Sequence, residues 1–158
     1  MDTATVAAIK KELNYYSQDE LLQVCLRLAK FKKENKELLT YLLFEAENEQ
    51  GYIDSVKEFI DEAFDGLNTK NYYLIKKGVR KILTAVKKYI RYSQNKETEV
   101  VLLLYFCRKL RTMKPSFTRN SVLRNTYQTQ LRMIKNTLAK LHEDLQYDYQ
   151  IELDKLES

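Results

Sequence analysis

The chain contains almost none of the residues that interrupt regular secondary structure. Its 158 residues include one proline, three glycines and no tryptophan. A β-sandwich or β-barrel turns about every 8 to 12 residues and needs such residues at its turns, whereas helices need few of them. We therefore expect an all-α protein. The length suits one compact domain, so the sequence predicts a single domain over residues 1–158.

Long apolar runs are also absent. The longest uninterrupted run, at residues 100–107, is well short of the roughly 20 apolar residues that cross a bilayer. The first twelve residues lack the basic start and apolar core of a secretion signal. The sequence therefore predicts a cytoplasmic protein that neither spans nor binds a membrane.

Residues that carry out catalysis are few. His142 is the only histidine, and its acidic surroundings are typical of a surface residue rather than a general base. Cys25 and Cys107 lie among apolar residues at helical spacing, which predicts buried, reduced thiols rather than a disulfide or a metal site. The isolated glycines form no phosphate-binding loop. We therefore expect no enzyme, and no cofactor, metal site or small-molecule substrate.

Capping residues divide the apolar pattern into six or seven helices. Ser17 and Glu20 have the spacing of a capping box. The pattern predicts consecutive antiparallel hairpins, arranged either as a helical bundle or as a short HEAT-like array. The helix predicted at 95–114 should lie at the centre, because its segment VVLLLYFC is apolar on all sides. It leaves open whether residues 17–50 form one kinked helix or two. The other expected starts are Thr3, Asn35, a position just after Gly51, Asn68 or Thr69, and Asn120 or Ser121.

The last predicted helix, residues 121–158, has apolar residues in alternating steps of four and three, the spacing of a coiled-coil seam. Two interpretations remain open. The helix could pack within the bundle and leave a loose acidic end at 146–158, or the seam could join two copies of the chain. The seam residues are Tyr127, Leu131, Ile134, Leu138, Leu141 and Leu145.

Charge is distributed unevenly along the chain. Residues 67–140 contain 18 Lys and Arg but two Asp and Glu, whereas the formal net charge of the whole chain is +5. On the helix predicted at 69–93 the cations share one face, opposite the apolar residues. Like charges at this spacing repel one another, so the sequence indicates that something compensates them.

Three compensations remain open. A stripe of carboxylates on the helix predicted between Gly51 and Gly66 could pair with the basic helix. The basic centre of one chain could meet the acidic ends of another. Alternatively, an external polyanion could bind, with Tyr73 and Tyr92 placed to stack on unpaired bases. The candidate binding residues are Lys70, Lys77, Arg80, Lys81, Lys88 and Arg91, with Arg119 and Arg124 near the start of the last helix as a further anion site.

Several segments of the first two thirds of the chain carry a resemblance to a known family. They are DELL at 19–22, LRLAKFKKENKELLTYLL at 26–43, VKEFIDEAF at 56–64 and EVVLLLYF at 99–106. Over about residues 1–110 the chain resembles a family of small all-helical bacterial domains of unknown function. The resemblance implies a bacterial, helical and non-enzymatic protein, and it brings no assigned activity or site residue.

Two functional hypotheses follow from these patterns. The first is a helical scaffold that binds a protein partner or associates with itself, indicated by the seam and by the separation of acidic and basic segments. The alternative is a protein that binds nucleic acid or another polyanion through the basic face at residues 70–91.

Overall fold

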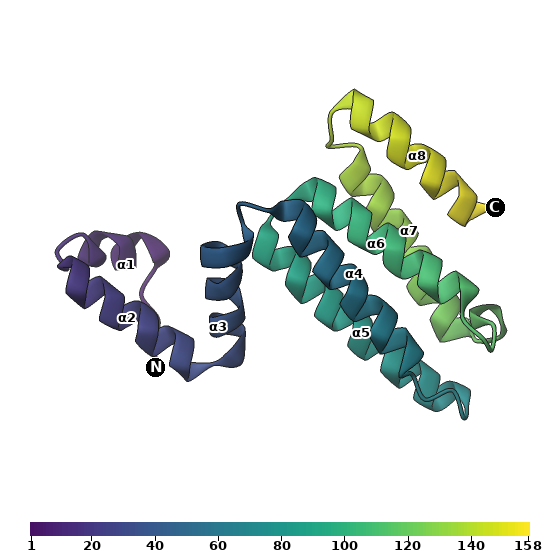
Figure 1. The fold of residues 1–158 in the computed structure, drawn as a ribbon, viewed down its shortest axis with the longest axis horizontal. Coiled ribbons are helices and arrows are strands. Elements are labelled where there is room, and N and C mark those ends of the chain that lie inside the picture. The colour runs from purple at the N-terminus through teal and green to yellow at the C-terminus, as the bar shows by residue number, and fades with distance from the viewer. The chain divides into compact units, whose positions relative to one another are not determined.

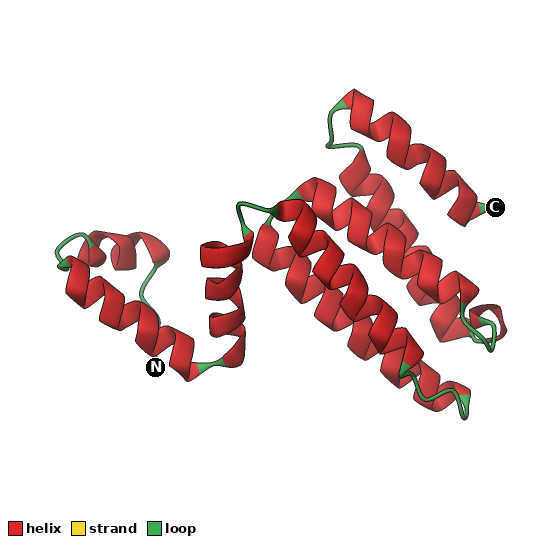
Figure 2. Cartoon of the chain, viewed as in Figure 1, coloured by secondary structure: helices red, strands yellow, loops and turns green.

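Every regular element of the protein is helical (Figure 1, Figure 2). The computed structural model describes residues 1–158 and confirms the all-α prediction. A π-helical turn at Tyr41–Glu45 follows the third helix, and a 3-10 turn at Phe117–Arg119 precedes the seventh. The helices are α1 (Val6–Leu13), α2 (Gln18–Phe31), α3 (Lys33–Thr40), α4 (Glu49–Asp65), α5 (Tyr72–Ser93), α6 (Lys96–Thr112), α7 (Ser121–Leu138) and α8 (Glu143–Glu157).

The chain divides into two compact units, residues 1–44 and residues 45–158, where the sequence predicts one domain. We call them the first unit and the second unit. None of the residues of α1, α2 or α3 is buried, whereas α4 to α8 all bury side chains. The apolar positions of the first three helices therefore form no buried core of their own, which the helical spacing of the sequence could not reveal.

Side-chain caps begin most of the helices at or close to the predicted places. The Ser17 hydroxyl accepts a hydrogen bond from the Glu20 amide at 3.2 Å, and the Glu20 carboxylate accepts one from the Ser17 amide at 3.0 Å. The capping box is thus confirmed. Asn95 and Asn120 cap α6 and α7 as predicted.

Other starts differ from the prediction. Asn35 caps no helix, because its amide donates to the Leu28 carbonyl at 2.8 Å. The break falls instead at Lys32, which is extended with φ −147° and ψ 140°, so residues 17–50 are not one helix. The cap of α1 is Thr5 rather than Thr3.

The start of α4 also corrects the prediction. Gly51 lies in the first turn of α4 rather than ahead of it, and its amide donates to the Asn48 side chain at 3.0 Å. A Cβ at Gly51 would lie 2.5 Å from the Asn48 side-chain nitrogen. Any other residue at position 51 would therefore have to displace the Asn48 side chain that caps α4.

Helix α6 forms the centre of the second unit. Consecutive helices from α4 to α8 run in opposite directions (Figure 1), and α6 contacts α4, α5, α7 and α8. The predicted core at the VVLLLYFC segment is confirmed, since Val100, Leu102 and Phe106 are fully buried. Cys107 is buried there too, and burial raises the pKa of its thiol to about 12. Cys25 is exposed, contrary to the prediction, and both thiols are free.

The last predicted helix is two helices. It breaks after Leu138, and α8 begins after His142, whose Nδ1 accepts from the Asp144 amide at 3.3 Å. The Gln146 side chain donates to the Leu141 carbonyl at 2.7 Å. These side chains satisfy backbone groups that a helix end leaves unpaired, so the chain reverses there without glycine or proline.

The predicted coiled-coil seam is wrong as an oligomer interface. Tyr127, Leu131, Ile134 and Leu138 are at most 3% exposed within the second unit. Leu141 and Leu145 lie beyond the break and are half-buried. The apolar residues at alternating steps of four and three therefore form the face by which α7 packs within the second unit.

The acidic C-terminal end is docked rather than loose. Leu153 is fully buried and Leu156 is 8% exposed. The Tyr127 hydroxyl donates to the Leu156 carbonyl at 2.7 Å, and the Tyr149 hydroxyl donates to Glu97 at 2.7 Å. Residues 146–158 are thus part of the packed second unit, because the reversal at 139–142 returns them to α6 and α7.

Candidate polyanion-binding surface

The basic face of α5 is set by the packing of the opposite face. Ile75, Val79 and Val86 are at most 1% exposed, and helical geometry therefore turns the cations between them outward. We use the name "basic face" for the α5 residues Lys76, Lys77, Arg80, Lys81, Lys87, Lys88 and Arg91.

The stripe of carboxylates predicted on α4 after Gly51 forms no ion pair with α5. Its member Asp61 instead contacts Lys109 of α6 at 3.2 Å and accepts from the Tyr105 hydroxyl at 2.7 Å. Burial and this hydrogen bond raise the pKa of Tyr105. The expected pairing of the α4 stripe with α5 is therefore wrong. The rotation of α4 in the bundle turns Asp61 toward α6, and sequence adjacency alone could not define that rotation.

The carboxylates of α8 compensate cations of α6 and α7. Glu152 contacts Arg108 at 2.9 Å, and Glu157 pairs with Lys135. Arg111 of α6 donates to backbone carbonyls at the end of the chain. Within residues 108–135, carboxylates of the second unit thus neutralise Arg108, Lys109 and Lys135.

Most cations of the basic face have no carboxylate partner in the second unit. The Lys87 ammonium lies 3.7 Å from the Met133 sulfur, and the Lys88 ammonium lies 5.3 Å from the centre of the Tyr89 ring. Arg80 and Arg91 are exposed. Five side chains of the face form neither an ion pair nor a hydrogen bond with residues 45–158: Lys76, Lys77, Arg80, Lys81 and Arg91.

The surface near the start of α5 is concave. Tyr73, Lys76, Lys77 and Arg80 line a depression of about 310 Å³. Asn71 accepts from the Leu74 amide at 3.0 Å and so fixes the first turn of the helix. Three cations and one aromatic ring are therefore presented together from a rigid, capped helix.

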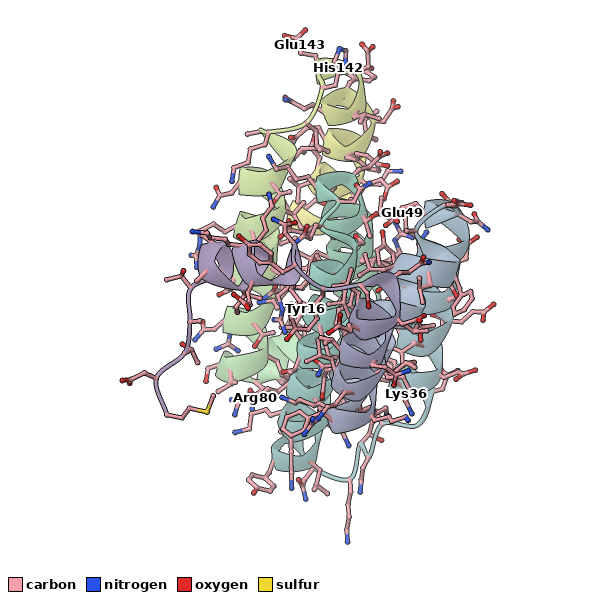
Figure 3. All side chains as sticks on the ribbon, turned by 90° about the vertical axis from the view of Figure 1, so that its left-hand side faces the viewer. Tyr16, Lys36, Glu49, Arg80, His142 and Glu143 are labelled. Atoms are coloured by element: carbon pink, nitrogen blue, oxygen red, sulfur yellow. The ribbon has the colours of Figure 1, made fainter.

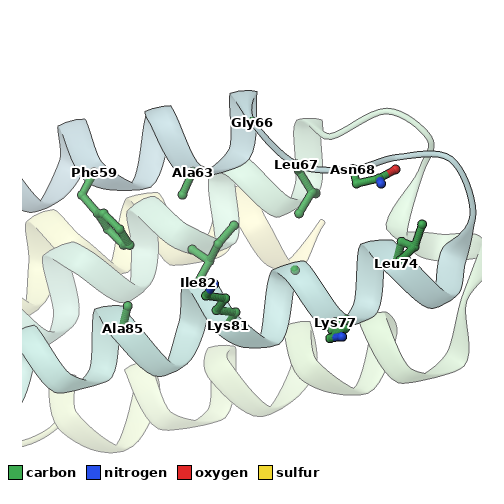
Figure 4. Close-up of a pocket in the computed structure, with 11 residues that line it drawn as sticks. Phe59, Ala63, Gly66, Leu67, Asn68, Leu74, Lys77, Lys81, Ile82 and Ala85 are labelled. Atoms are coloured by element: carbon green, nitrogen blue, oxygen red, sulfur yellow. The ribbon is translucent and has the colours of Figure 1, made fainter.

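A second, mainly apolar groove lies between α4 and α5 (Figure 4). It has a volume of about 520 Å³, and Phe59, Leu74 and Ile82 are among its walls. Lys77 and Lys81 supply its charge. Gly78 allows Leu67 to approach the helix, because a Cβ there would lie 2.3 Å from Leu67 Cδ1.

The remaining predicted cations occupy different places. Lys70 precedes α5, since the helix is capped by Asn71 rather than by Asn68 or Thr69. Arg119 lies on the 3-10 turn that follows Ser116, whose carbonyl accepts from the Tyr72 hydroxyl at 2.8 Å, so this turn borders the start of α5.

Arg124 and Tyr92 are less available than the sequence suggests. The Arg124 guanidinium donates to the Thr118 carbonyl. The half-buried Tyr92 ring packs against Tyr89, with 6.2 Å between the ring centres. Of the two tyrosines predicted to stack on bases, Tyr73 is the one whose side chain is exposed, at 68%.

His142 has a structural position. It caps α8 beside Glu143, at an end of the second unit far from Arg80 (Figure 3). No group of three or more His, Cys, Asp or Glu side chains is arranged to hold a metal ion. No helix combines the length and apolar character that crossing a bilayer requires.

Comparison with known proteins finds no relative of the chain. No family model, no curated protein and no solved structure matches it. The resemblance of residues 1–110 to small helical bacterial domains therefore stays a prediction.

Proposed function

We propose that this chain is a binding protein whose second unit binds nucleic acid through the basic face of α5. One contrast supports the proposal. Arg108 and Lys109 of α6 and Lys135 of α7 have carboxylate partners. The α5 cations Lys76, Lys77, Arg80, Lys81 and Arg91 have none within the same unit. A helix that keeps its cations together without partners maintains like-charge repulsion that an anionic ligand would relieve.

The dimensions of the face suit a phosphate backbone. From Lys76 to Arg91 the helix extends about 22 Å at roughly 1.5 Å per residue. Lysine and arginine neutralise successive phosphates and release condensed counterions, so affinity arises without sequence recognition and falls steeply with salt. The proposed ligand is therefore recognised by its charge density.

Binding of a fluorescein-labelled oligonucleotide, followed by fluorescence anisotropy across a salt series, tests the proposal. We expect wild-type binding at low salt with a steep decrease in affinity as salt rises. The double substitution Lys77→Glu with Arg80→Glu should weaken binding at least tenfold and flatten the salt dependence. It leaves the core unchanged, because both side chains are exposed.

The matched control is Lys140→Glu with Lys155→Glu. It changes the net charge by the same amount at exposed positions outside α5, and it should retain near wild-type affinity. Absence of binding by the wild type at low salt, or equal losses in the two double variants, would refute a site on α5.

A second candidate function is self-association through the first unit, supported by its exposed apolar side chains. Phe31 is 84% exposed and Phe44 is 77% exposed, and large apolar patches on a surface are typical of interaction sites. This interpretation replaces the C-terminal seam as the basis for a scaffold role, because the seam residues of α7 are buried.

A further inference from the structure

Tyr73 differs from the other tyrosines of α5 in having no partner in the second unit. The Tyr72 hydroxyl donates to the Ser116 carbonyl. Tyr89 packs edge-on against Phe59, with 5.4 Å between the ring centres, and Tyr92 packs on Tyr89. The Tyr73 side chain is 68% exposed. Its ring therefore adds little to the stability of the fold, whereas a buried aromatic ring contributes strongly.

Three cations share the helix face of Tyr73. Residues three, four and seven positions further along a helix lie on the same face, and at these positions are Lys76, Lys77 and Arg80. Together the four side chains line the depression of about 310 Å³. The depression therefore offers a flat aromatic ring beside three cations that no carboxylate of the second unit engages.

We infer that this depression binds single-stranded nucleic acid, with one unpaired base stacked on the Tyr73 ring and the neighbouring phosphates held by Lys76, Lys77 and Arg80. The inference rests on the proposed function and specifies its ligand. Stacking on aromatic side chains next to a basic track is how proteins hold single strands without reading their sequence, because every base has a π-face.

A duplex fits this surface less well than a single strand. Its bases are stacked on one another and cannot reach the Tyr73 ring without being flipped out. The neighbouring helix α4 also exposes the carboxylates of Asp54, Glu58 and Glu62. A duplex presents phosphates across its whole width, and some of them would approach these carboxylates, whereas one strand can follow α5 alone.

The test uses the full chain and fluorescein-labelled dT20, with a duplex of the same length as competitor. Tyr73→Ala should weaken binding of dT20 about tenfold at every salt concentration while the slope of affinity against salt stays unchanged, because no phosphate contact is lost. Tyr73→Phe should restore the affinity, since it keeps the ring. Lys76→Glu should instead reduce the slope.

Tyr147→Ala is the matched control. Tyr147 is 72% exposed but lies on the acidic helix α8, so its removal should leave the binding of dT20 unchanged. The circular dichroism spectra of all variants should coincide with that of the wild type, because neither tyrosine side chain is buried.

The outcomes separate this inference from the proposed function. If dT20 binds but Tyr73→Ala retains full affinity, or if the duplex competes as well as unlabelled dT20, the single-strand site is refuted while nucleic-acid binding by α5 stands. If neither oligonucleotide binds at low salt, both proposals are refuted.

Discussion

At the residue scale, burial gives the two cysteines different chemistry. Cys107 is enclosed in the core at 0% exposure, where loss of solvation disfavours a thiolate and raises the pKa of the thiol to about 12. Cys25 is exposed on α2. Because the thiolate is the nucleophile, burial makes Cys107 unreactive in two ways: it disfavours the thiolate and it blocks access to the sulfur.

We therefore expect one thiol of the native protein to react with an aromatic disulfide reagent at neutral pH. Mass spectrometry should locate the label at Cys25, and a second equivalent should react only in denaturant, when Cys107 becomes accessible. Cys25→Ser should abolish the native reaction. Rapid labelling of Cys107 in the native protein would contradict the packing of α6.

At the scale of elements, α8 shows how a charged segment is held by a few buried contacts. Its sequence is acidic enough to suggest a loose end, yet Leu153 is fully buried, and Glu152 and Glu157 pair with cations of α6 and α7. Glu97 of α6 accepts from Tyr149 of α8, and burial together with this bond raises the pKa of the phenol. The exposed ion pairs contribute little, so the apolar contacts dominate the docking of α8.

Leu153→Ala should accordingly lower the free energy of unfolding by about 2 to 5 kcal/mol, the usual cost of removing a buried leucine side chain. Urea unfolding followed by circular dichroism measures it. The control is Ile151→Ala on the same helix, where the side chain is 44% exposed and the loss should be below about 1 kcal/mol. Equal, small losses in both variants would indicate that α8 does not dock.

At the scale of the whole molecule, the two units differ in the surface that they expose: unpaired cations in the second unit and apolar side chains in the first. Folding of the second unit brings the acidic C-terminal helix onto α6 and α7. It leaves five α5 cations without a carboxylate partner in that unit: Lys76, Lys77, Arg80, Lys81 and Arg91. The first unit has the opposite character, because its exposed side chains include large apolar ones such as Leu43 at 67%. The two candidate functions therefore belong to different parts of the chain.

If the first unit mediates self-association, light scattering after size-exclusion chromatography should give a mass above that of the 18.8 kDa chain at high protein concentration. Phe31→Ser with Leu28→Ser should restore the monomer, since both side chains are exposed and their loss leaves the core intact. Leu131→Ala in the former seam should lower stability without changing the mass. A wild-type mass equal to the monomer at every concentration would exclude self-association.

The helical class, the caps at Ser17, Asn95 and Asn120, and the core at residues 100–107 could be predicted without the structure. These features depend on local hydrogen bonding and on an apolar surface that must be buried wherever the chain folds. Which cations form ion pairs, in contrast, depends on how the helices pack against one another. Asp61 and Lys109 are far apart in sequence, as are Arg108 and Glu152, and such pairs depend on how each helix is rotated in the bundle. The reversal of the chain before His142 also depends on tertiary packing. Burial of Leu153 stabilises the protein only when α8 packs against α6 and α7.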